Sequence, residues 1–198
     1  DVEHLEYPPE IDVCDGYLIT GSKRSVYEDE PWIQQLGAFV QTLHQARKKL
    51  VGICFGHQLV AQVLGGKTEK SDRGWGVGRH DTRLLLDLNA DAPAGTQFSL
   101  LSSHQDQVSK LPGSARVLAQ SEFCPIAGML IDQHILTFQG HPEFDTAYAR
   151  ALLQIRRELV GEAKYEVAIS SMAQVPDQAR VAEWILRFIE DNDAGTSA

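Results

Sequence analysis

The first third of the chain alternates short apolar runs with amphipathic stretches. Tyr17–Thr20 predicts a buried strand, and Leu50–Ile53 predicts a second one. Between them, apolar residues recur at helical spacing after Pro31, namely Ile33, Leu36, Val40 and Leu43. A second helical pattern follows Ile53 and is ended by the glycine pair Gly65-Gly66. Strands that alternate with helices in this way predict an α/β sandwich.

The middle third carries five short apolar runs separated by Gly, Pro, Asp and Asn. These runs are Thr82–Leu88, Phe98–Ser102, Ala115–Ala119, Ala127–Ile131 and His134–Phe138. The pair Asp132-Gln133 predicts a tight hairpin between the last two. We therefore expect antiparallel strands to be added to a sheet that begins as parallel. Gly74–Gly78 has no strand before it and no clear helix after it, so it predicts a loop near the rim of a site rather than a phosphate-binding turn.

The last third is predicted to be helical from Asp145 onward. Two apolar sets each share a helix face: Tyr148, Leu152, Ile155 and Leu159, and then Val181, Trp184, Ile185 and Phe188. The small polar tail 191–198 predicts a frayed end. Because no long linker interrupts the pattern, we expect one domain over residues 1–198.

Composition excludes several classes of protein. The chain has 198 residues and a formal net charge of −9, which argues against a nucleic-acid partner. The basic runs Arg47-Lys48-Lys49 and Arg156-Arg157 are short, and we interpret them as solvated helix faces. The N-terminus has neither the basic nor the apolar segment of a secretory signal, and no apolar run could span a membrane. Three cysteines, an odd and sparse set, indicate a reducing compartment, so we expect a cytoplasmic protein.

The segment Gly52-Ile53-Cys54-Phe55-Gly56 is the strongest chemical signal in the sequence. A predicted strand leads into Cys54 and a predicted helix leaves it, with a glycine two residues away on each side. This pattern indicates a nucleophile elbow, a strained turn in which the neighbouring backbone passes too close for a Cβ atom. A helix N-terminus favours the thiolate and offers the N–H of Phe55 to an oxyanion. The alternative is that Cys54 is a small buried apolar residue, as most free cysteines are.

A second segment supplies the base that a thiolate needs. His141 ends a predicted strand within Gly140-His141-Pro142-Glu143. Pro142 favours an extended conformation for His141, so His141 and Glu143 should project to the same side. Glu143 would then orient the imidazole. The alternative is an ordinary solvated loop, which becomes the weaker interpretation once Cys54 is considered.

Taken together, the two segments resemble the class I, triad-type glutamine amidotransferases, in particular the free-standing branch that is similar to GMP synthase. The resemblance covers the chain from Asp15 to about Asp145. It implies a flavodoxin-like, three-layer α/β/α sandwich with a mixed sheet, a mainly parallel core and added antiparallel strands. The order Cys, His, Glu differs from that of α/β-hydrolases, in which the acid precedes the histidine.

The resemblance also implies roles for particular residues. Cys54 would attack the side-chain amide of glutamine, form a γ-glutamyl thioester and release ammonia, with His141 as general acid and base and Glu143 as its partner. Phe55 and Gly21 would supply the oxyanion hole, although Thr20-Gly21-Ser22 departs from the Gly-Gly-Pro that is common in the family. The residues implied to bind substrate are Gln58 and, from the segment Ser102–Val108, Ser103 and Gln105.

Three functions remain open at this point. The first is a glutaminase that supplies ammonia to an acceptor, which would require a separate synthase subunit. The second is a γ-glutamyl peptidase or hydrolase that uses the same three side chains, and the third is a silent regulatory subunit. No metal or organic cofactor is implied, because a thiolate and an oxyanion hole suffice for acyl transfer. His44, His80 and His134 lack metal-ligand spacing, His57 is interpreted as structural, and Cys14 and Cys124 as inert.

The resemblance implies one more element before the first strand. Family members usually place an apolar strand and a helix before the segment equivalent to Tyr17–Thr20. Here Val2–Tyr7 is the only strand candidate, so we expect that a core strand and its helix lie upstream of Asp1.

Overall fold

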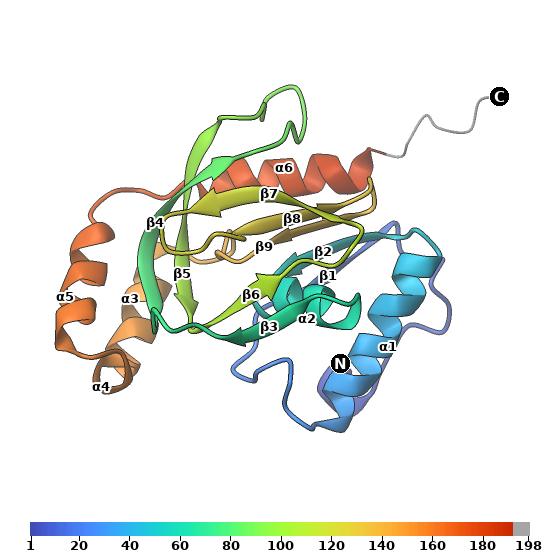
Figure 1. Ribbon diagram of the computed structural model, residues 1–198, viewed down its shortest axis with the longest axis horizontal. Coiled ribbons are helices and arrows are strands. Elements are labelled where there is room, and N and C mark those ends of the chain that lie inside the picture. The colour runs from blue at the N-terminus through green and yellow to red at the C-terminus, as the bar shows by residue number, and fades with distance from the viewer. Residues whose placement is uncertain (192–198) are drawn as a thin grey trace.

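The computed structural model describes residues 1–191, and it is built around a mixed seven-stranded sheet (Figure 1). The strand order is β1-β2-β9-β8-β7-β4-β5, in which β1, β2 and β9 are parallel and the remaining neighbours are antiparallel. The seven strands are β1 (Gly16–Ile19), β2 (Lys49–Ile53), β4 (Gly76–Leu84), β5 (Gln97–His104), β7 (Ala115–Ser121), β8 (Gly128–Ile131) and β9 (Ile135–Phe138). The α/β class and the mixed sheet are therefore confirmed.

Helices cover both faces of this sheet. One face carries α1 (Pro31–Gln45) and α2 (Phe55–Val63), and the other carries α6 (Gln178–Glu190) (Figure 1). On the first face, Val40, Leu43 and Leu59 pack with sheet residues in one apolar cluster, and α1 begins at Pro31, a residue suited to a first helical turn. On the other face, the α6 residues Val181 and Trp184 pack in a second cluster.

Three further helices stand at the β4–β5 end of the sheet. They are α3 (Thr146–Ile155), α4 (Arg157–Val160) and α5 (Glu162–Ser171), and they bury a third apolar cluster that includes Leu101 and Leu153. The carboxylate of Asp145 caps α3 by accepting a hydrogen bond from the backbone N–H of Tyr148. Two short strands, β3 (Lys67–Lys70) and β6 (Asp106–Lys110), form a separate antiparallel pair.

Three sequence expectations about local structure are wrong. Val2–Tyr7 is not a strand, because Val2–His4 forms a 3₁₀ turn instead. Gly76–Gly78 is not loop but the start of β4, where Gly78 has a φ of +87° and lies against α5. A Cβ atom on Gly78 would come within 2.8 Å of the backbone of Ala168, so this strand needs a glycine there.

The third concerns the apolar set Tyr148, Leu152, Ile155 and Leu159, which was expected to share the face of one helix but is divided between α3 and α4. Tyr148, Ile155 and Leu159 are more than half exposed, and the helix instead buries Ala149 and Leu153. The reason is that α3 ends at Ile155, so the expected face does not continue as one helix into Leu159.

The frayed tail 191–198 falls outside the described residues from position 192 onward. None of the helices between residues 1 and 191 combines the length and apolar character needed to cross a membrane. One domain over residues 1–198, a cytoplasmic location and an upstream strand and helix stay predictions.

Candidate active site

Three parallel strands bring the chemical groups to one edge of the sheet. The strands β1, β2 and β9 are neighbours and run in the same direction. The segment after β1 carries Gly21, the residue after β2 is Cys54, and the segment after β9 carries His141. Because carboxyl ends of parallel strands meet at the same edge, these three residues converge although more than 100 positions of sequence separate the first from the last.

Cys54 stands on a strained turn between β2 and α2. Its φ of 52° and ψ of −98° lie in a region that side chains rarely adopt. The two flanking glycines make the turn sterically feasible. A Cβ atom on Gly52 would come within 2.7 Å of the backbone of Gly56, and one on Gly56 would come within 2.3 Å of the carbonyl oxygen of Ile19. The backbone geometry is therefore that of a nucleophile elbow.

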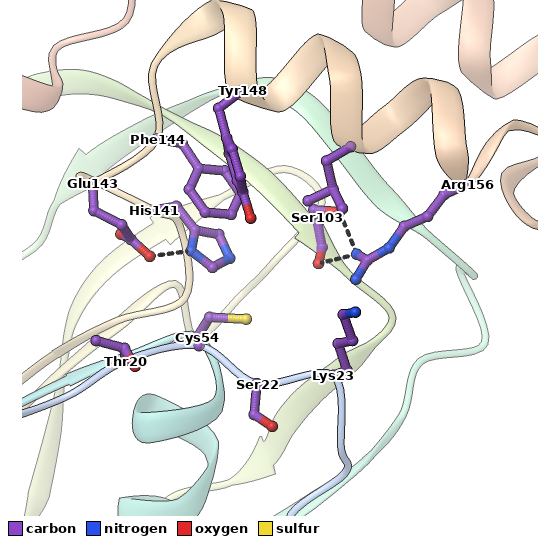
Figure 2. Close-up of a pocket in the computed structure, with 12 residues that line it drawn as sticks. Thr20, Ser22, Lys23, Cys54, Ser103, His141, Glu143, Phe144, Tyr148 and Arg156 are labelled. Carbon is purple, nitrogen blue, oxygen red and sulfur yellow. Dashed lines mark hydrogen bonds and ion pairs between the residues drawn. The ribbon is translucent and has the colours of Figure 1, made fainter. Parts of the chain in front are cut away.

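His141 is held by hydrogen bonds on the backbone and on the ring. Its backbone N–H donates to the carbonyl oxygen of Leu101 at 2.8 Å, which fixes the segment after β9 against β5. Its Nδ1 lies 2.7 Å from Oε1 of Glu143. The imidazole is buried, whereas the Glu143 side chain is 43% exposed. This arrangement leaves Nε2 of the ring for Cys54, whose side chain lies beneath it (Figure 2).

The environment favours the protonated imidazole. Burial lowers the pKa of His141, but the hydrogen bonds and charges of Cys54 and Glu143 outweigh it and raise the pKa to about 9. The ring of Phe144 stacks on the imidazole, with 3.8 Å between centroids and 8° between planes. A π face is attractive to a cation, so this stacking also suits an imidazolium.

Gly21 and Phe55 lie close to Cys54, and their role as oxyanion donors stays a prediction. A Cβ atom on Gly21 would be 2.9 Å from Cε1 of His141 and 3.7 Å from Cβ of Cys54, so Gly21 lies near both residues. Phe55 is the first residue of α2, so its N–H has no acceptor within the helix.

A two-lobed cavity opens over Cys54. One lobe, the His141 lobe, has a volume of about 420 Å³ and is lined by His141, Glu143 and an apolar wall of Phe144, Tyr148 and Leu152 (Figure 2). The second lobe, the Gln58 lobe, has a volume of about 200 Å³ and polar walls that include Gln58, Gln105 and Asp106. Both lobes share Ser22, Lys23, Cys54, Ser103 and Arg156.

The residues expected to bind substrate lie in these lobes in different ways. Gln58 is 4% exposed, and its amide nitrogen donates to the carbonyl oxygen of Asp106 at 2.8 Å and to Oε1 of Gln139 at 3.0 Å. That nitrogen is therefore already engaged within the protein. Gln105 lines the Gln58 lobe, and Ser103 lines both lobes.

Arg156 is a residue of the cavity that the sequence analysis assigned to a solvated helix face. It is half-buried, its Nη1 donates to the carbonyl oxygen of Ser103 and, at 2.7 Å, to the Ser103 hydroxyl, and its guanidinium lies 5.4 Å from the ring centre of Trp75. No pattern in the sequence distinguishes it, whereas in the structure Arg156 lies just past the end of α3, three positions after the buried Leu153 and on the same side of the helix.

Cys14, Cys124 and His57 do not line the cavity. Burial raises the pKa of Cys124 to about 12, and burial lowers the pKa of His57 to about 3, with Nδ1 of His57 2.8 Å from the Thr137 hydroxyl. Cys14 is exposed. Within residues 1–191, no group of three or more His, Cys, Asp or Glu side chains could hold a metal ion.

The geometry can be compared with known protein families. The model of the family described as glutamine amidotransferase class-I matches residues 2–154, which is most of the chain. The chain belongs to the class I glutamine amidotransferase family. The matched residues include Cys54, His141 and Glu143, on which the resemblance to this family was based.

Two curated relatives of this amidotransferase-family chain carry different names. Gamma-glutamyl peptidase 3 of Arabidopsis thaliana is 35% identical over 148 residues, which is 71% of this chain and 59% of that protein. A glutamine-hydrolysing GMP synthase of Dehalococcoides mccartyi is 35% identical over 130 residues, which is 65% of this chain and 23% of the synthase. The chain thus spans about three fifths of the length of the peptidase that it matches.

Solved structures of amidotransferases share the fold. A glutamine amidotransferase from Methylobacillus flagellatus superposes with a TM-score of 0.74, covering 93% of this chain and 78% of that one, at 21% sequence identity. At this identity the likeness concerns the fold alone.

Proposed function

We propose that this protein is a cysteine γ-glutamyl hydrolase that cleaves γ-glutamyl amides of amino acids or short peptides. Cys54 is the nucleophile, His141 the general acid and base, and Glu143 the group that orients and charges the imidazole. The backbone N–H groups of Gly21 and Phe55 stabilise the oxyanion.

The first half of the reaction is acylation. The thiolate of Cys54 attacks the γ-carbonyl carbon, and the carbonyl oxygen becomes an oxyanion held by the two N–H groups. When the tetrahedral intermediate collapses, the C–N bond breaks and the leaving nitrogen takes a proton from the imidazolium of His141. The products of this half are a γ-glutamyl thioester on Cys54 and a free amine.

The second half is hydrolysis of the thioester. Neutral His141 removes a proton from a water molecule, whose oxygen attacks the thioester carbon. Collapse of the intermediate breaks the C–S bond, releases glutamate and regenerates the thiolate beside the imidazolium. No redox step and no further reactant is needed.

The size of the His141 lobe favours a γ-glutamyl peptide over glutamine as the substrate. The general acid must stand beside the leaving nitrogen, so the leaving group occupies the lobe that His141 lines. Ammonia has roughly the volume of a water molecule, about 30 Å³. A lobe of about 420 Å³ is much larger, so it suits an amino acid or a short peptide. The 35% identity to a protein named gamma-glutamyl peptidase supports the same choice.

Glutamine hydrolysis is the second candidate. The similarity to a glutamine-hydrolysing GMP synthase favours it, and the thioester chemistry would be identical. In that case the released ammonia would pass to an acceptor enzyme.

A release assay separates the two candidates. Purified protein is given glutamine and, separately, a panel of γ-glutamyl amino acids and dipeptides, and the released amine or ammonia is measured. We expect kcat/KM for the best peptide to exceed that for glutamine by at least tenfold. A preference for glutamine would replace the first candidate with the second.

A labelling experiment tests the nucleophile itself. A glutamine-mimicking electrophile should alkylate Cys54, as located by peptide mass mapping, and should not react with the buried Cys124. The variant Cys54→Ala should keep its thermal unfolding transition and lose turnover. An unlabelled Cys54 in folded protein would instead support a silent regulatory subunit.

A further inference from the structure

The two lobes can be assigned to the two halves of the substrate, given the proposed function. Cys54 lines both lobes, so the scissile bond lies where they meet. His141 lines only the larger lobe and must reach the leaving nitrogen, whereas Gln58 and Gln105 line only the smaller one. The γ-glutamyl group therefore extends into the Gln58 lobe, and the leaving group extends into the His141 lobe.

Two cations that line both lobes, Lys23 and Arg156, have no carboxylate partner among residues 1–191. They come from different elements, the loop after β1 and the end of α3, and in Figure 2 both side chains point toward the same part of the cavity. Among residues 1–191, no acidic side chain forms an ion pair with either of them, and Arg156 donates hydrogen bonds to Ser103 and lies over the ring of Trp75, both of which are neutral. The acidic residue of this lobe, Glu143, is engaged by His141.

This excess of positive charge is unusual for the chain as a whole. The protein has a formal net charge of −9, so most of its surface should repel anions. A guanidinium that is half-buried and already oriented by Ser103 is preorganised to bind a carboxylate through its remaining N–H groups. A free amine such as ammonia would gain nothing from such a site.

The opposite wall of the lobe is apolar. Tyr148 and Leu152 lie one turn apart on α3, Phe144 lies in the segment just before this helix, and the ring of Tyr148 packs edge-on against Phe144 at 4.7 Å between centroids. Together, the two walls match the two features of a residue with a free carboxylate and an apolar side chain.

We infer that the His141 lobe is a leaving-group subsite, in which Arg156 and Lys23 bind the free carboxylate of the departing amino acid or peptide. The wall of Phe144, Tyr148 and Leu152 takes its apolar side chain. Arg156 and Lys23 are then specificity residues that select γ-glutamyl substrates whose leaving group ends in a carboxylate. This inference rests on the proposed function and adds the chemistry of the leaving group to it.

Paired substrates test the inference. Each γ-glutamyl amino acid or dipeptide is compared with the same molecule carrying a C-terminal amide, which removes the negative charge and keeps the size. We expect the wild-type protein to prefer the free carboxylate by roughly tenfold or more in kcat/KM, because a charge-assisted hydrogen bond is lost in the amide. Arg156→Gln and Lys23→Gln should each reduce this preference, mainly by raising KM for the carboxylate form.

Two further variants complete the design. Arg156→Lys keeps the charge and should retain part of the preference. Arg157→Gln is the matched control, because Arg157 is the adjacent arginine, pairs with Glu162 and does not line the lobe. It should leave the preference unchanged, and thermal unfolding of every variant checks folding.

Each other outcome identifies which idea fails. If the wild-type protein cleaves free and amidated peptides equally well, the subsite is wrong while the proposed function stands. If Arg156→Gln slows both forms by the same factor, Arg156 serves the α-carboxylate of the γ-glutamyl group and the inference is overturned. If glutamine alone is cleaved, the proposed function and the inference are both overturned.

Discussion

The ring of Phe144 lies parallel to the imidazole of His141, at 3.8 Å between centroids, and so covers one face of the ring. Glu143 holds the same imidazole in its plane, through Nδ1. One short segment, Gly140–Phe144, thus supplies the base, its charge partner and the ring that packs on it. The imidazole has little freedom to turn away from Cys54, and its protonation state depends on these neighbours.

Glu143→Gln should therefore change the pH profile as well as the rate. The pKa of His141 is raised to about 9, partly by Glu143, so the imidazolium persists up to that pH in the wild-type protein. Removing the carboxylate charge should lower this pKa and move the alkaline limb of kcat/KM to lower pH. We also expect kcat/KM near neutral pH to fall about 10²-fold, which is typical when acid–base catalysis is impaired.

Steady-state kinetics across the neutral and alkaline range measure both effects. Glu158→Gln serves as the control, because Glu158 is an exposed carboxylate on α4 that does not line the cavity. An alkaline limb that stays in place in Glu143→Gln would show that Glu143 does not charge the imidazole.

Gly56→Ala should destabilise the fold through a single steric contact. The new Cβ atom would lie 2.3 Å from the carbonyl oxygen of Ile19, a backbone atom that cannot move without displacing β1. We expect the free energy of unfolding to fall by about 1–3 kcal/mol. Gly113→Ala is the matched control, because nothing lies within 4 Å of its added Cβ, and it should change stability by less than about 0.5 kcal/mol. Chemical denaturation measures both, and equal effects would contradict the steric argument.

The turn at this glycine was predictable from the sequence, whereas other parts of the fold were not. The glycines at positions 52 and 56 are needed because backbone atoms pass close to them on both sides of Cys54. Glycines at this spacing around a cysteine can be recognised from the local sequence alone. By contrast, β3 and β6 read as polar segments, because each buries only one or two side chains, such as Thr68 and Val108. Their pairing depends on a contact across about 40 residues that no local pattern encodes.

The cavity was predictable only in part, for a similar reason. The order of Cys54, His141 and Glu143 pointed to one site, because the ends of parallel strands converge. Arg156 was missed because its neighbour Arg157 is a surface ion-pair residue, and the sequence alone made the two look alike. The break between α3 and α4 separates them, and it places Arg156 on the inner side.

Cys54→Gly should be more stable than Cys54→Ala, which reverses the usual order. Cys54 has a φ of 52°, and a residue with a Cβ atom in such a region carries about 1–3 kcal/mol of strain that glycine does not. Greater flexibility of glycine in the unfolded chain offsets about 0.4–1 kcal/mol of this gain. Both variants should lack hydrolytic activity.

Ala151→Gly is the comparison variant, in which glycine should lower the stability of the protein as it usually does in a helix. Ala151 is exposed within α3, and glycine there should cost about 1 kcal/mol. Urea denaturation of the three variants measures the differences. If Cys54→Ala proves as stable as Cys54→Gly, the elbow stores no strain in its backbone.

The free energy of unfolding should pass through a maximum near pH 6.5, because folding lowers the pKa of some histidines and raises that of His141. Burial lowers the pKa of His57 and of His104 to about 3, below the value of 6.5 for an unfolded histidine. The unfolded chain therefore binds more protons than the folded chain between about pH 3 and 6.5, and stability falls as the pH falls through that range. Each such histidine contributes up to about 1.4 kcal/mol per pH unit.

His141 acts in the opposite direction above that pH. Its folded pKa of about 9 exceeds the unfolded value of 6.5, so its contribution is fully present below pH 6.5 and is lost as the pH rises through 9. Urea denaturation as a function of pH measures both limbs. Cys54→Ala removes the hydrogen bond that contributes most to raising the pKa of His141, so it should flatten the alkaline limb. His57→Gln should reduce the slope of the acidic limb alone. A wild-type profile that is flat from pH 6.5 to 9 would mean that the imidazole of His141 is not held as a cation, and the acid that protonates the leaving group would have to be sought elsewhere.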